Sequence, residues 1–550
     1  MGARTNGNDI KMKKVMFARM TRLALLRFWK TPITDVTSSA VVLSESTDRR
    51  AESNAEEPSP SSKSVEQIAS PSNAKSKTIT PNYLGYLSGV VTSLWKSEQP
   101  TESEEAQKKR VSRVVMKHFS RSEVINRAQG LINKLIMAQS SESIRLRAQE
   151  LCRHFVEYPA TRVIAVQNKR FMKTLLSFLR NISDEEMKGE IRECLSVMGY
   201  VDFPKGAGVR ILSIDGGGTR GMMGLEILQA LEDALHGRKV AEMFDHIVGV
   251  STGAIIAVLL GAKELSLERC KEIYVEISRE LFSQGRISGV SGLLLSHSYY
   301  NTKKWREILK KRIGEEETLL NSCRRKDAPK LSVVSCIVNA PMLQPYIFRN
   351  YVHPPGRESH FKGGCEHMLW QALEASAAAP GYFEEVALGS ILHQDGGVLA
   401  NNPTALALHE ARMLWPNERI QCVVSVGNGH HVNELETTNV KLSTRIQEKI
   451  TRIVDSATDT ELVHLCMHDL LPANTYFRLN PYMSFPYTLD EIDPKKLAQM
   501  ENDARLYVRR NRAKIEAAAE ALLMQPSVTQ IISRRLREMA QRSGLYTPSF

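Results

Sequence analysis

Apolar residues recur in two different rhythms along this chain of 550 residues. Between residues 105 and 198, runs such as SEVINRAQGLINKLIMA and ESIRLRAQELCRHFVEY place them at steps of three and four, which is the period of an amphipathic helix. From residue 207 onward, short continuous apolar segments alternate with helical patterns. The pattern therefore predicts a helical region followed by an α/β unit.

Four of the apolar segments are expected to form core strands: 209–214, 246–250, 331–338 and 421–426. Helical patterns separate them, namely MGLEILQALEDAL, the small-residue run at 252–261, and MLWQALEASAAA. Strands that alternate with helices in this way form mainly parallel sheets with helices on their faces. We therefore predict a central, mainly parallel sheet.

The first hundred residues have a different composition. Residues 11–30 hold seven Lys or Arg and no acid, as in a mitochondrial transit peptide or a membrane-surface helix, although the basic residues do not gather on one helical face. Residues 31–80 contain 18 Ser or Thr and no aromatic side chain. Such a segment buries too little apolar area to offset its chain entropy, so we predict a disordered leader.

The net charge of +12 indicates an anionic partner surface, for which nucleic acid and acidic lipid headgroups are the candidates. The eight cysteines are scattered, with no CxxC pair and no Cys/His cluster at metal-binding spacing. This spacing argues against a secreted disulfide framework and against structural zinc. We expect an intracellular, reducing compartment.

Three glycine-containing motifs carry the candidate chemistry. DGGGTRG (215–221) lies between a predicted strand and a helix, where its backbone N–H groups can converge on an oxyanion or a phosphate. GVSTG (249–253) also joins a strand to a helix and has the nucleophile-elbow pattern, in which a sharp turn exposes the hydroxyl of Ser251. DGG (395–397) places the carboxylate of Asp395 in a tight loop.

The glycine loop alone admits other interpretations. IDGGGT resembles the phosphate loop of sugar-kinase and actin-like ATPases, for which DGG at 395–397 would be a second phosphate loop. That interpretation leaves the serine elbow without a role. Gly216, Gly218 and Gly221 nominally match a dinucleotide fingerprint, but no acidic residue ends a second strand about 20 residues later.

Four segments in one order carry a family resemblance: ILSIDGGGTRG, FDHIVGVSTGAIIA, WQALEASAAAPGYFEEV and HQDGGVLANNPTALALHEA. Through them, residues 209–429 resemble the patatin-like phospholipases, and within these the gamma branch of the calcium-independent phospholipases A2. The resemblance implies a patatin-like three-layer α/β fold. The expected domains are a disordered basic and Ser-rich leader (1–104), a helical accessory region (105–206), the patatin-like phospholipase catalytic domain (207–490) and a basic helical C-terminal region (491–550).

The resemblance also implies a Ser–Asp dyad without histidine, in which Ser251 is the nucleophile and Asp395 accepts its proton. Backbone N–H groups of the glycine loop would form the oxyanion hole, with Gly217 and Gly218 as the favoured donors. No cofactor or metal is implied, and no EF-hand loop is present in the sequence to bind calcium. The expected supporting residues are Gly216, Gly217, Gly218, Thr219, Arg220 and Gly221 of the oxyanion hole, Gly249 and Gly253 of the elbow, and Gly396 and Gly397 of the DGG loop.

Several other residues have two competing interpretations. His430 and His431 are the candidates for the third member of a conventional triad, and we expect neither to be needed; His409 is expected to be structural. Arg220 would either approach a lipid phosphate or pair with Asp215, and we favour the ion pair. Segments 293–295, 380–383 and 481–487 would either contact lipid or form ordinary core.

Combined with the charge, the resemblance implies a membrane-associated intracellular phospholipase with A1/A2 and lysophospholipase activity. Its expected partners are the phospholipid substrate and an anionic membrane surface, not nucleic acid, and a homo-oligomer is compatible with the sequence. We favour the mitochondrion, with the endoplasmic reticulum and the peroxisome as alternatives, since the chain ends in TPSF and not in SKL. The rival functions are the kinase-like ATPase and an inactive lipid-binding scaffold.

Overall fold

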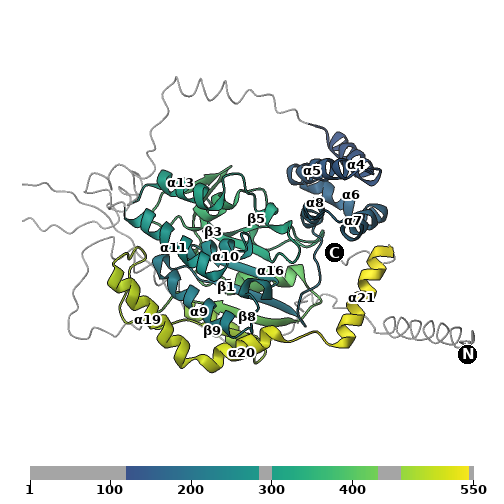
Figure 1. Ribbon diagram of the computed structural model, residues 1–550. Helices are drawn as coiled ribbons and strands as arrows, with labels where there is room; N and C mark the ends of the chain where they lie inside the picture. The colour runs from purple at the N-terminus through teal and green to yellow at the C-terminus, as the bar shows by residue number, and fades with distance from the viewer. Residues whose placement is uncertain (1–118, 284–299, 432–459, 544–550) are drawn as a thin grey trace, which may run out of the picture. The chain divides into compact units, whose positions relative to one another are not determined.

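The computed structural model describes residues 119–283, 300–431 and 460–543 (Figure 1). The predicted disordered leader, its basic segment and the segment 293–295 lie outside these residues. None of the helices described is long and apolar enough to cross a membrane.

The predicted helical region is confirmed. Its helices pack around a common apolar cluster that includes Leu135, Leu151, Phe155 and Ile191. Local signals set their starts: Ser120 and Glu123 form a capping box at the first helix, and Asp184 caps the last. The helices are α4 (Arg121–Ile136), α5 (Ser141–Glu157), α6 (Arg162–Gln167), α7 (Lys169–Asn181) and α8 (Glu185–Val197).

A nine-stranded sheet forms the centre of the α/β unit, with the order β5-β4-β3-β2-β1-β8-β9 and with β7 pairing β3 and β6. Five of its eight strand pairings are parallel, so the expectation of a mainly parallel sheet is confirmed. The strands are β1 (Val209–Ile214), β2 (His246–Val250), β3 (Lys330–Ile337), β4 (Gln344–Arg349), β5 (Lys362–Gly364), β6 (Val386–Leu388), β7 (Ile391–Asp395), β8 (Ile420–Val426) and β9 (Tyr476–Leu479).

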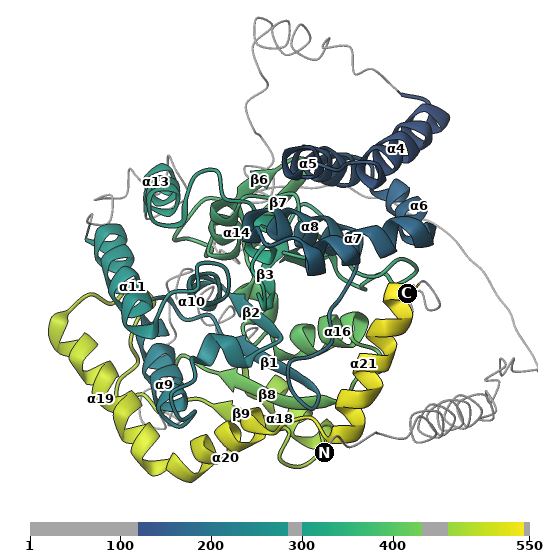
Figure 2. The same ribbon diagram turned by 45° about the vertical axis from the view of Figure 1, so that its right-hand side comes forward.

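Helices cover both faces of the sheet, which gives the predicted three layers (Figures 1 and 2). Alternate residues of β1 face opposite layers: Leu212 and Ile214 pack with the larger helical layer, and Ile211 packs with the smaller one. The larger layer contains α9 (Gly221–Asp233), α10 (Thr252–Gly261), α11 (Leu267–Phe282), α13 (Thr302–Ile313), α14 (Leu369–Ser376) and α20 (Arg512–Leu523); the smaller contains α16 (Thr404–Leu414) and α18 (Thr460–Leu470).

The end of the chain is helical, as expected. α19 (Pro494–Arg510) packs on α9, α20 packs on β8 and α9, and α21 (Val528–Ser543) packs on α7. A short helix, α15 (Gly397–Ala400), directly follows β7. Because Asp395 ends β7, it lies at the end of a strand and not in an isolated loop.

Candidate active site

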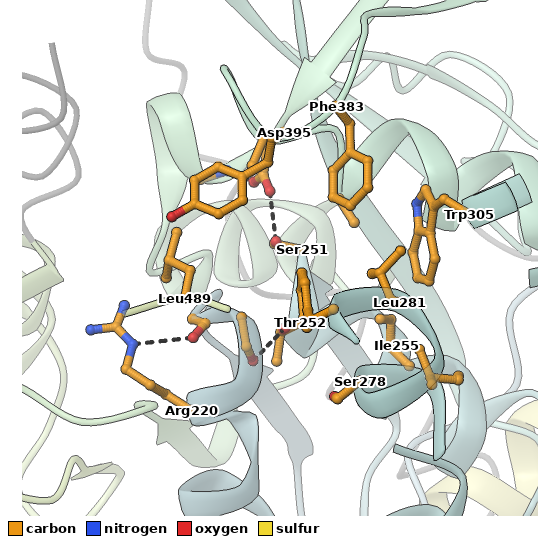
Figure 3. Close-up of a pocket in the computed structure, with 18 of the residues that line it drawn as sticks. Arg220, Ser251, Thr252, Ile255, Ser278, Leu281, Trp305, Phe383, Asp395 and Leu489 are labelled. Carbon is orange, nitrogen blue, oxygen red and sulfur yellow. Dashed lines mark hydrogen bonds between the residues drawn. The ribbon is translucent and has the colours of Figure 1, made fainter. Parts of the chain in front are cut away.

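The structure brings Ser251 and Asp395 together, although 144 residues separate them in the chain. The Oγ of Ser251 donates a hydrogen bond of 2.6 Å to Oδ2 of Asp395 (Figure 3). β2 ends at Val250, and β7 reaches the same edge because Asp395 lies opposite Ser335 of β3, which is itself parallel to β2. Sheet register therefore sets the meeting of the two side chains.

Ser251 lies on a strained turn. Its φ of 53° and ψ of −122° are unfavourable for a residue with a side chain. A Cβ at Gly249 would overlap the carbonyl oxygen of Gly253, and a Cβ at Gly253 would overlap that of Ile214. The two glycines thus allow the close approach of strand and helix that this turn requires, as the elbow pattern predicts.

Ser376 holds the backbone of this turn. Its Oγ accepts a hydrogen bond of 2.9 Å from the N–H of Ser251 and donates one of 2.6 Å to the carbonyl of Val334. Ser251 is the N-cap residue of α10, yet its side chain does not cap the helix. Its hydroxyl is therefore committed to Asp395.

Asp395 is buried and held from two sides. Its Oδ1 accepts a hydrogen bond of 2.7 Å from the N–H of Gly397, while Oδ2 accepts from Ser251. Burial raises the pKa of Asp395 to about 6, and these two hydrogen bonds oppose the rise. A carboxylate with this pKa is a better proton acceptor than a solvated aspartate and is still ionised at neutral pH.

The glycine loop borders the same pocket. Six of its residues were expected to supply N–H groups for an oxyanion, and four of these N–H groups already donate to backbone carbonyl oxygens. The N–H of Gly216 donates to Asn401, that of Thr219 to Leu489, that of Arg220 to Gly217, and that of Gly221 to Gly218. In the described part of the chain, the N–H groups of Gly217 and Gly218 find no acceptor. These two are the donors left for a ligand, and both residues line the pocket beside Ser251.

Two buried hydroxyls orient the peptide of Gly218. The Oγ1 of Thr252 donates a hydrogen bond of 2.8 Å to the carbonyl of Gly218 (Figure 3). The hydroxyl of Tyr274 donates to the same oxygen. Burial raises the pKa of Tyr274, so its hydroxyl stays protonated and remains a donor. Sequence inspection missed this role, since Tyr274 reads as an ordinary core position of an amphipathic helix.

The expected ion pair between Arg220 and Asp215 is wrong. Asp215 instead accepts a hydrogen bond of 2.6 Å from Nη2 of Arg478 in β9, and both side chains are buried. The Nε of Arg220 donates 3.1 Å to the carbonyl of Gly217, and Arg220 lines the pocket. Asp215 has a buried cation from a distant strand as its partner, so Arg220 is not required for charge balance there.

The rest of the pocket is largely apolar. α10 and α11 contribute Ile255, Ile277 and Leu281, and Trp305 and Phe383 stack with ring centroids 5.9 Å apart (Figure 3). Tyr382 lies in the lining as well, so segment 380–383 belongs to the pocket. This lining fits a hydrocarbon chain better than a sugar or a nucleotide.

Among the described residues that line this pocket, none is histidine. The ring of His430 packs on Tyr482 with centroids 4.2 Å apart, and its backbone N–H donates to Pro481. His409, which lies on α16, accepts a hydrogen bond from the backbone N–H of His360. The geometry therefore offers Ser251 a carboxylate as its proton acceptor.

The described residues contain no cluster of His, Cys, Asp or Glu side chains suited to hold a metal ion. Ser251, Asp395 and the two unoccupied N–H groups bring a hydroxyl, a buried carboxylate and two hydrogen-bond donors to one pocket. Acyl transfer requires a nucleophile, a base and an anion cradle in such an arrangement.

Comparisons with known proteins agree with this class. The patatin-like phospholipase family model matches residues 212–408. Calcium-independent phospholipase A2-gamma of Homo sapiens is 40% identical over 466 residues, which cover 82% of this chain and 59% of that protein. Phospholipase A I of Arabidopsis thaliana is 31% identical over 370 residues, covering 58% and 28%. The chain belongs to the patatin-like phospholipase family.

This chain thus spans about three fifths of the length of the human relative. Among solved structures, VipD from Legionella pneumophila covers 61% of this chain and 74% of its own, at 12% identity and a TM-score of 0.30, a likeness too low to carry any conclusion.

Gly218 offers a direct test of the oxyanion cradle. Its φ is +57°, and a Cβ there would overlap the backbone of Leu489, so Gly218→Ala must displace the loop. We expect kcat to fall roughly a hundredfold to a thousandfold, the usual loss when an oxyanion donor is misplaced.

Gly237→Ala is the matched control, because Gly237 has a φ of +83° but no atom within 4 Å of the added Cβ. Both variants carry the strain of a positive φ, and only Gly218→Ala moves the cradle. Equal kcat values for the two variants would remove Gly218 from the oxyanion hole.

Proposed function

We propose that this protein is a calcium-independent phospholipase that hydrolyses fatty acyl esters of glycerophospholipids through a Ser251–Asp395 dyad. The single observation that carries the proposal is the 2.6 Å hydrogen bond from Ser251 to the buried Asp395 in the wall of a largely apolar pocket. Family membership supports the same chemistry. Activity of the phospholipase A1/A2 and lysophospholipase types follows if either acyl chain can occupy the pocket.

In the first half-reaction, Oγ of Ser251 attacks the ester carbonyl carbon while Asp395 accepts the hydroxyl proton. The N–H groups of Gly217 and Gly218 bind the oxyanion that develops, an interaction worth about 3 kcal/mol per donor. When the tetrahedral intermediate collapses, Asp395 returns the proton to the departing lysolipid oxygen. The fatty acyl group remains esterified to Ser251.

In the second half-reaction, water replaces the lysolipid. Asp395 accepts a proton from the water as it attacks the acyl-enzyme, and the same N–H groups bind the second oxyanion. Collapse of this intermediate releases the fatty acid and restores the hydroxyl of Ser251. One carboxylate therefore serves both steps, without a histidine.

The rival functions differ in what they need from the site. A kinase-like ATPase would use DGG at 395–397 as a phosphate loop, whereas here Asp395 faces a serine hydroxyl and the adjoining pocket is apolar. An inactive scaffold would not retain the strained Ser251, which has a structural cost of about 1–3 kcal/mol.

Hydrolysis of defined phospholipids by the purified protein tests the proposal, and the products identify which ester is cleaved. We expect free fatty acid and lysophospholipid without ATP or magnesium. Excess EGTA should leave the rate unchanged, because both half-reactions use only protein groups. Loss of hydrolysis on chelation, with recovery on adding calcium, would contradict the proposed mechanism.

For the cellular setting we propose an anionic intracellular membrane, at the mitochondrion in preference to the endoplasmic reticulum or the peroxisome. The net charge of +12 and the acid-free basic segment at residues 11–30 support this proposal. A fluorescent fusion to the C-terminus, compared with one lacking residues 11–30, tests it: mitochondrial fluorescence should be lost with the segment.

A further inference from the structure

Exposed apolar side chains occur on three segments at the strand edge that carries Ser251. β3, β2, β1, β8 and β9 run parallel to one another, so the segments that follow β3 and β9 share this edge. β7 runs antiparallel to β3, and the hydrogen bond from Ser251 to Asp395 at the end of β7 places the start of α15 beside Ser251. Their large exposed side chains, which we call the rim residues, are Met342 and Leu343 in the β3–β4 turn, Leu399 in α15, and Tyr482 and Phe485 after β9.

Two of the three rim segments also contribute residues to the lining of the pocket. Leu399 lies between Val398 and Asn401, which line the pocket, and the loop that carries Phe485 continues to Leu489, which also lines it. β3 and β9 are four strand positions apart, or about 20 Å at ~4.8 Å per strand, with β2 and Ser251 between them. Rim segments therefore lie on both sides of Ser251 along this edge.

The loop after β9 is anchored in a way that keeps its exposed residues outward. Met483 and Tyr487 are buried, and both the N–H and the Oγ of Ser484 donate to Asp503 of α19. Tyr482 and Phe485, in the same stretch, remain 61% and 59% exposed. From the sequence, segment 481–487 was expected either to form core or to contact lipid. In the structure, Met483 and Tyr487 are buried and anchor the loop, whereas the aromatic side chains of Tyr482 and Phe485 are exposed.

We propose that the rim residues dock this protein on the surface of a phospholipid bilayer, so that an acyl chain enters the pocket directly from the membrane. The inference rests on the proposed function and adds the face through which the site meets its substrate. Large apolar side chains exposed beside an apolar pocket indicate an apolar partner. Contacts spread over about 20 Å on separate segments suit a broad lipid surface better than a single bound helix.

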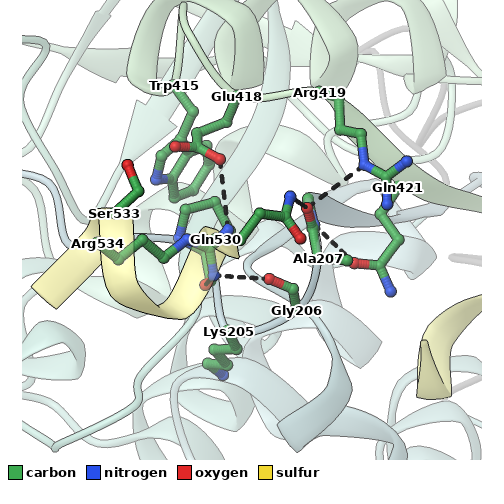
Figure 4. A network of polar contacts seen from close by, with 12 residues as sticks. Lys205, Gly206, Ala207, Trp415, Glu418, Arg419, Gln421, Gln530, Ser533 and Arg534 are labelled. Carbon is green, nitrogen blue, oxygen red and sulfur yellow. Dashed lines mark hydrogen bonds and ion pairs between the residues drawn. The ribbon is translucent and has the colours of Figure 1, made fainter. Parts of the chain in front are cut away.

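α21 provides an internal contrast at the opposite edge of the sheet. It exposes an apolar stripe that includes Ile532 and Leu536, while its polar face is docked: Arg534 donates to the carbonyls of Pro204 and Gly206 (Figure 4). These carbonyls precede β1, about one strand length (~20 Å) from the Ser251 edge. A bilayer that covers the rim does not include these contacts.

Two double variants separate the two surfaces. Tyr482→Ser/Phe485→Ser removes apolar area from the rim, and Ile532→Ser/Leu536→Ser removes it from α21 at residues of comparable exposure. Binding is measured by co-sedimentation with vesicles of phosphatidylcholine and phosphatidylglycerol, in a Ser251→Ala background that prevents hydrolysis. We expect the rim variant to bind at least tenfold more weakly and the α21 variant to bind within about twofold of the parent.

Turnover by the same double variants with Ser251 retained distinguishes a loss of membrane docking from a loss of catalytic chemistry. Both double variants should hydrolyse a water-soluble short-chain ester as the parent does, which also shows that they fold, and only the rim variant should lose rate on vesicles. Unchanged vesicle binding by the rim variant, or a loss of binding confined to the α21 variant, would overturn the inference. If the parent hydrolyses neither substrate, the proposed function fails instead.

A gain-of-signal measurement covers the case in which the rim variant does not fold. Phe485→Trp preserves an aromatic side chain, and its added fluorescence over the parent should be quenched by vesicles of brominated phosphatidylcholine. Ile532→Trp on α21 should show no such quenching. Quenching of the second tryptophan and not the first would contradict the proposed docking face.

Discussion

Replacing Ser251 with alanine is expected to lower kcat for phospholipid hydrolysis by a factor on the order of a million, because no other group can form the acyl-enzyme. The fold should persist, since the side chain does not cap α10 and, within the described part of the chain, hydrogen-bonds to Asp395 alone. Steady-state release of fatty acid from vesicles measures the effect, and circular dichroism checks the fold.

Ser278→Ala is the matched control, because Ser278 lines the same pocket on α11 without reaching Asp395. Its kcat should stay within about tenfold of the parent. A Ser251→Ala protein that retained more than a few per cent of the activity would remove Ser251 from the nucleophile's role.

Ser251→Gly adds a stability readout to the same prediction. Glycine adopts a φ of 53° with a ψ of −122° without the strain that a Cβ imposes. Ser251→Gly should therefore be as inactive as Ser251→Ala but about 1 kcal/mol more stable to unfolding than Ser251→Ala. Equal stabilities would indicate that the turn is relaxed around the serine.

Activity is expected to fall steeply as the pH drops through about 6, because Asp395 must be ionised to accept the proton and burial raises its pKa to about 6. A solvated aspartate with a pKa of 3.8 would keep the enzyme active two pH units lower. The pH dependence of kcat/KM on a water-soluble ester measures the pKa in the free enzyme.

The raised pKa of Asp395 also affects stability, in the opposite direction: activity requires the ionised carboxylate, whereas folding favours the protonated form. A carboxyl group with a folded pKa of about 6 and an unfolded value near 3.8 binds its proton more tightly when the protein is folded. Its favourable contribution to the free energy of unfolding is therefore present below pH 3.8 and is lost as the pH rises to 6. The difference corresponds to about 3 kcal/mol. Asp395→Asn should therefore be inactive but more stable than the parent near neutral pH.

This gain should disappear at about pH 4, where Asp395 is protonated in the native protein. Thermal unfolding of the two proteins across the pH range tests the linkage. A stability difference between them that is independent of pH would show that Asp395 does not titrate in this window. Burial also raises the pKa of Asp215 to about 6, but this group is common to both proteins and cancels in the comparison.

The elements that carry the nucleophile could be predicted from the sequence. β1 and β2 are fully buried runs bounded by turn residues, and α10 is a run of small and apolar residues, so local pattern and final structure agree at Val209–Ile214, His246–Val250 and Thr252–Gly261. The resemblance to the patatin-like phospholipases, carried by the glycine loop, the elbow and DGG in that order, then implied that Ser251 and Asp395 would meet. Pairing register, which only the structure supplies, shows how they meet.

Other parts of the site had no local signal. β7 and β9 are short, and the partner of Arg478 in β9 is Asp215, 263 residues away in the chain. Ser376 and Tyr274 lie in helices whose pattern indicates only packing, and their hydrogen bonds to the serine turn and to Gly218 depend on tertiary contacts. The expected pairing of Arg220 with Asp215 failed for the same reason, because proximity in sequence was the only guide.

The family resemblance favoured Gly217 and Gly218 among the six residues expected in the oxyanion hole, and the coordinates add a physical reason. The N–H groups of Gly216, Thr219, Arg220 and Gly221 donate to other backbone atoms, which among the described residues of the loop leaves those of Gly217 and Gly218. A glycine-rich sequence predicts that N–H groups can converge on an anion. Which of them remain unoccupied depends on Asn401 and Leu489, which belong to distant parts of the chain.

Labelling with a fluorophosphonate, followed by peptide mass spectrometry, tests the central claim most directly. The reagent should form one covalent phosphonyl adduct, on Ser251, with loss of fluoride, and Asp395→Asn should slow this reaction by orders of magnitude. Modification of a different serine, or equally fast labelling of Ser251 when Asp395 is replaced, would contradict the dyad.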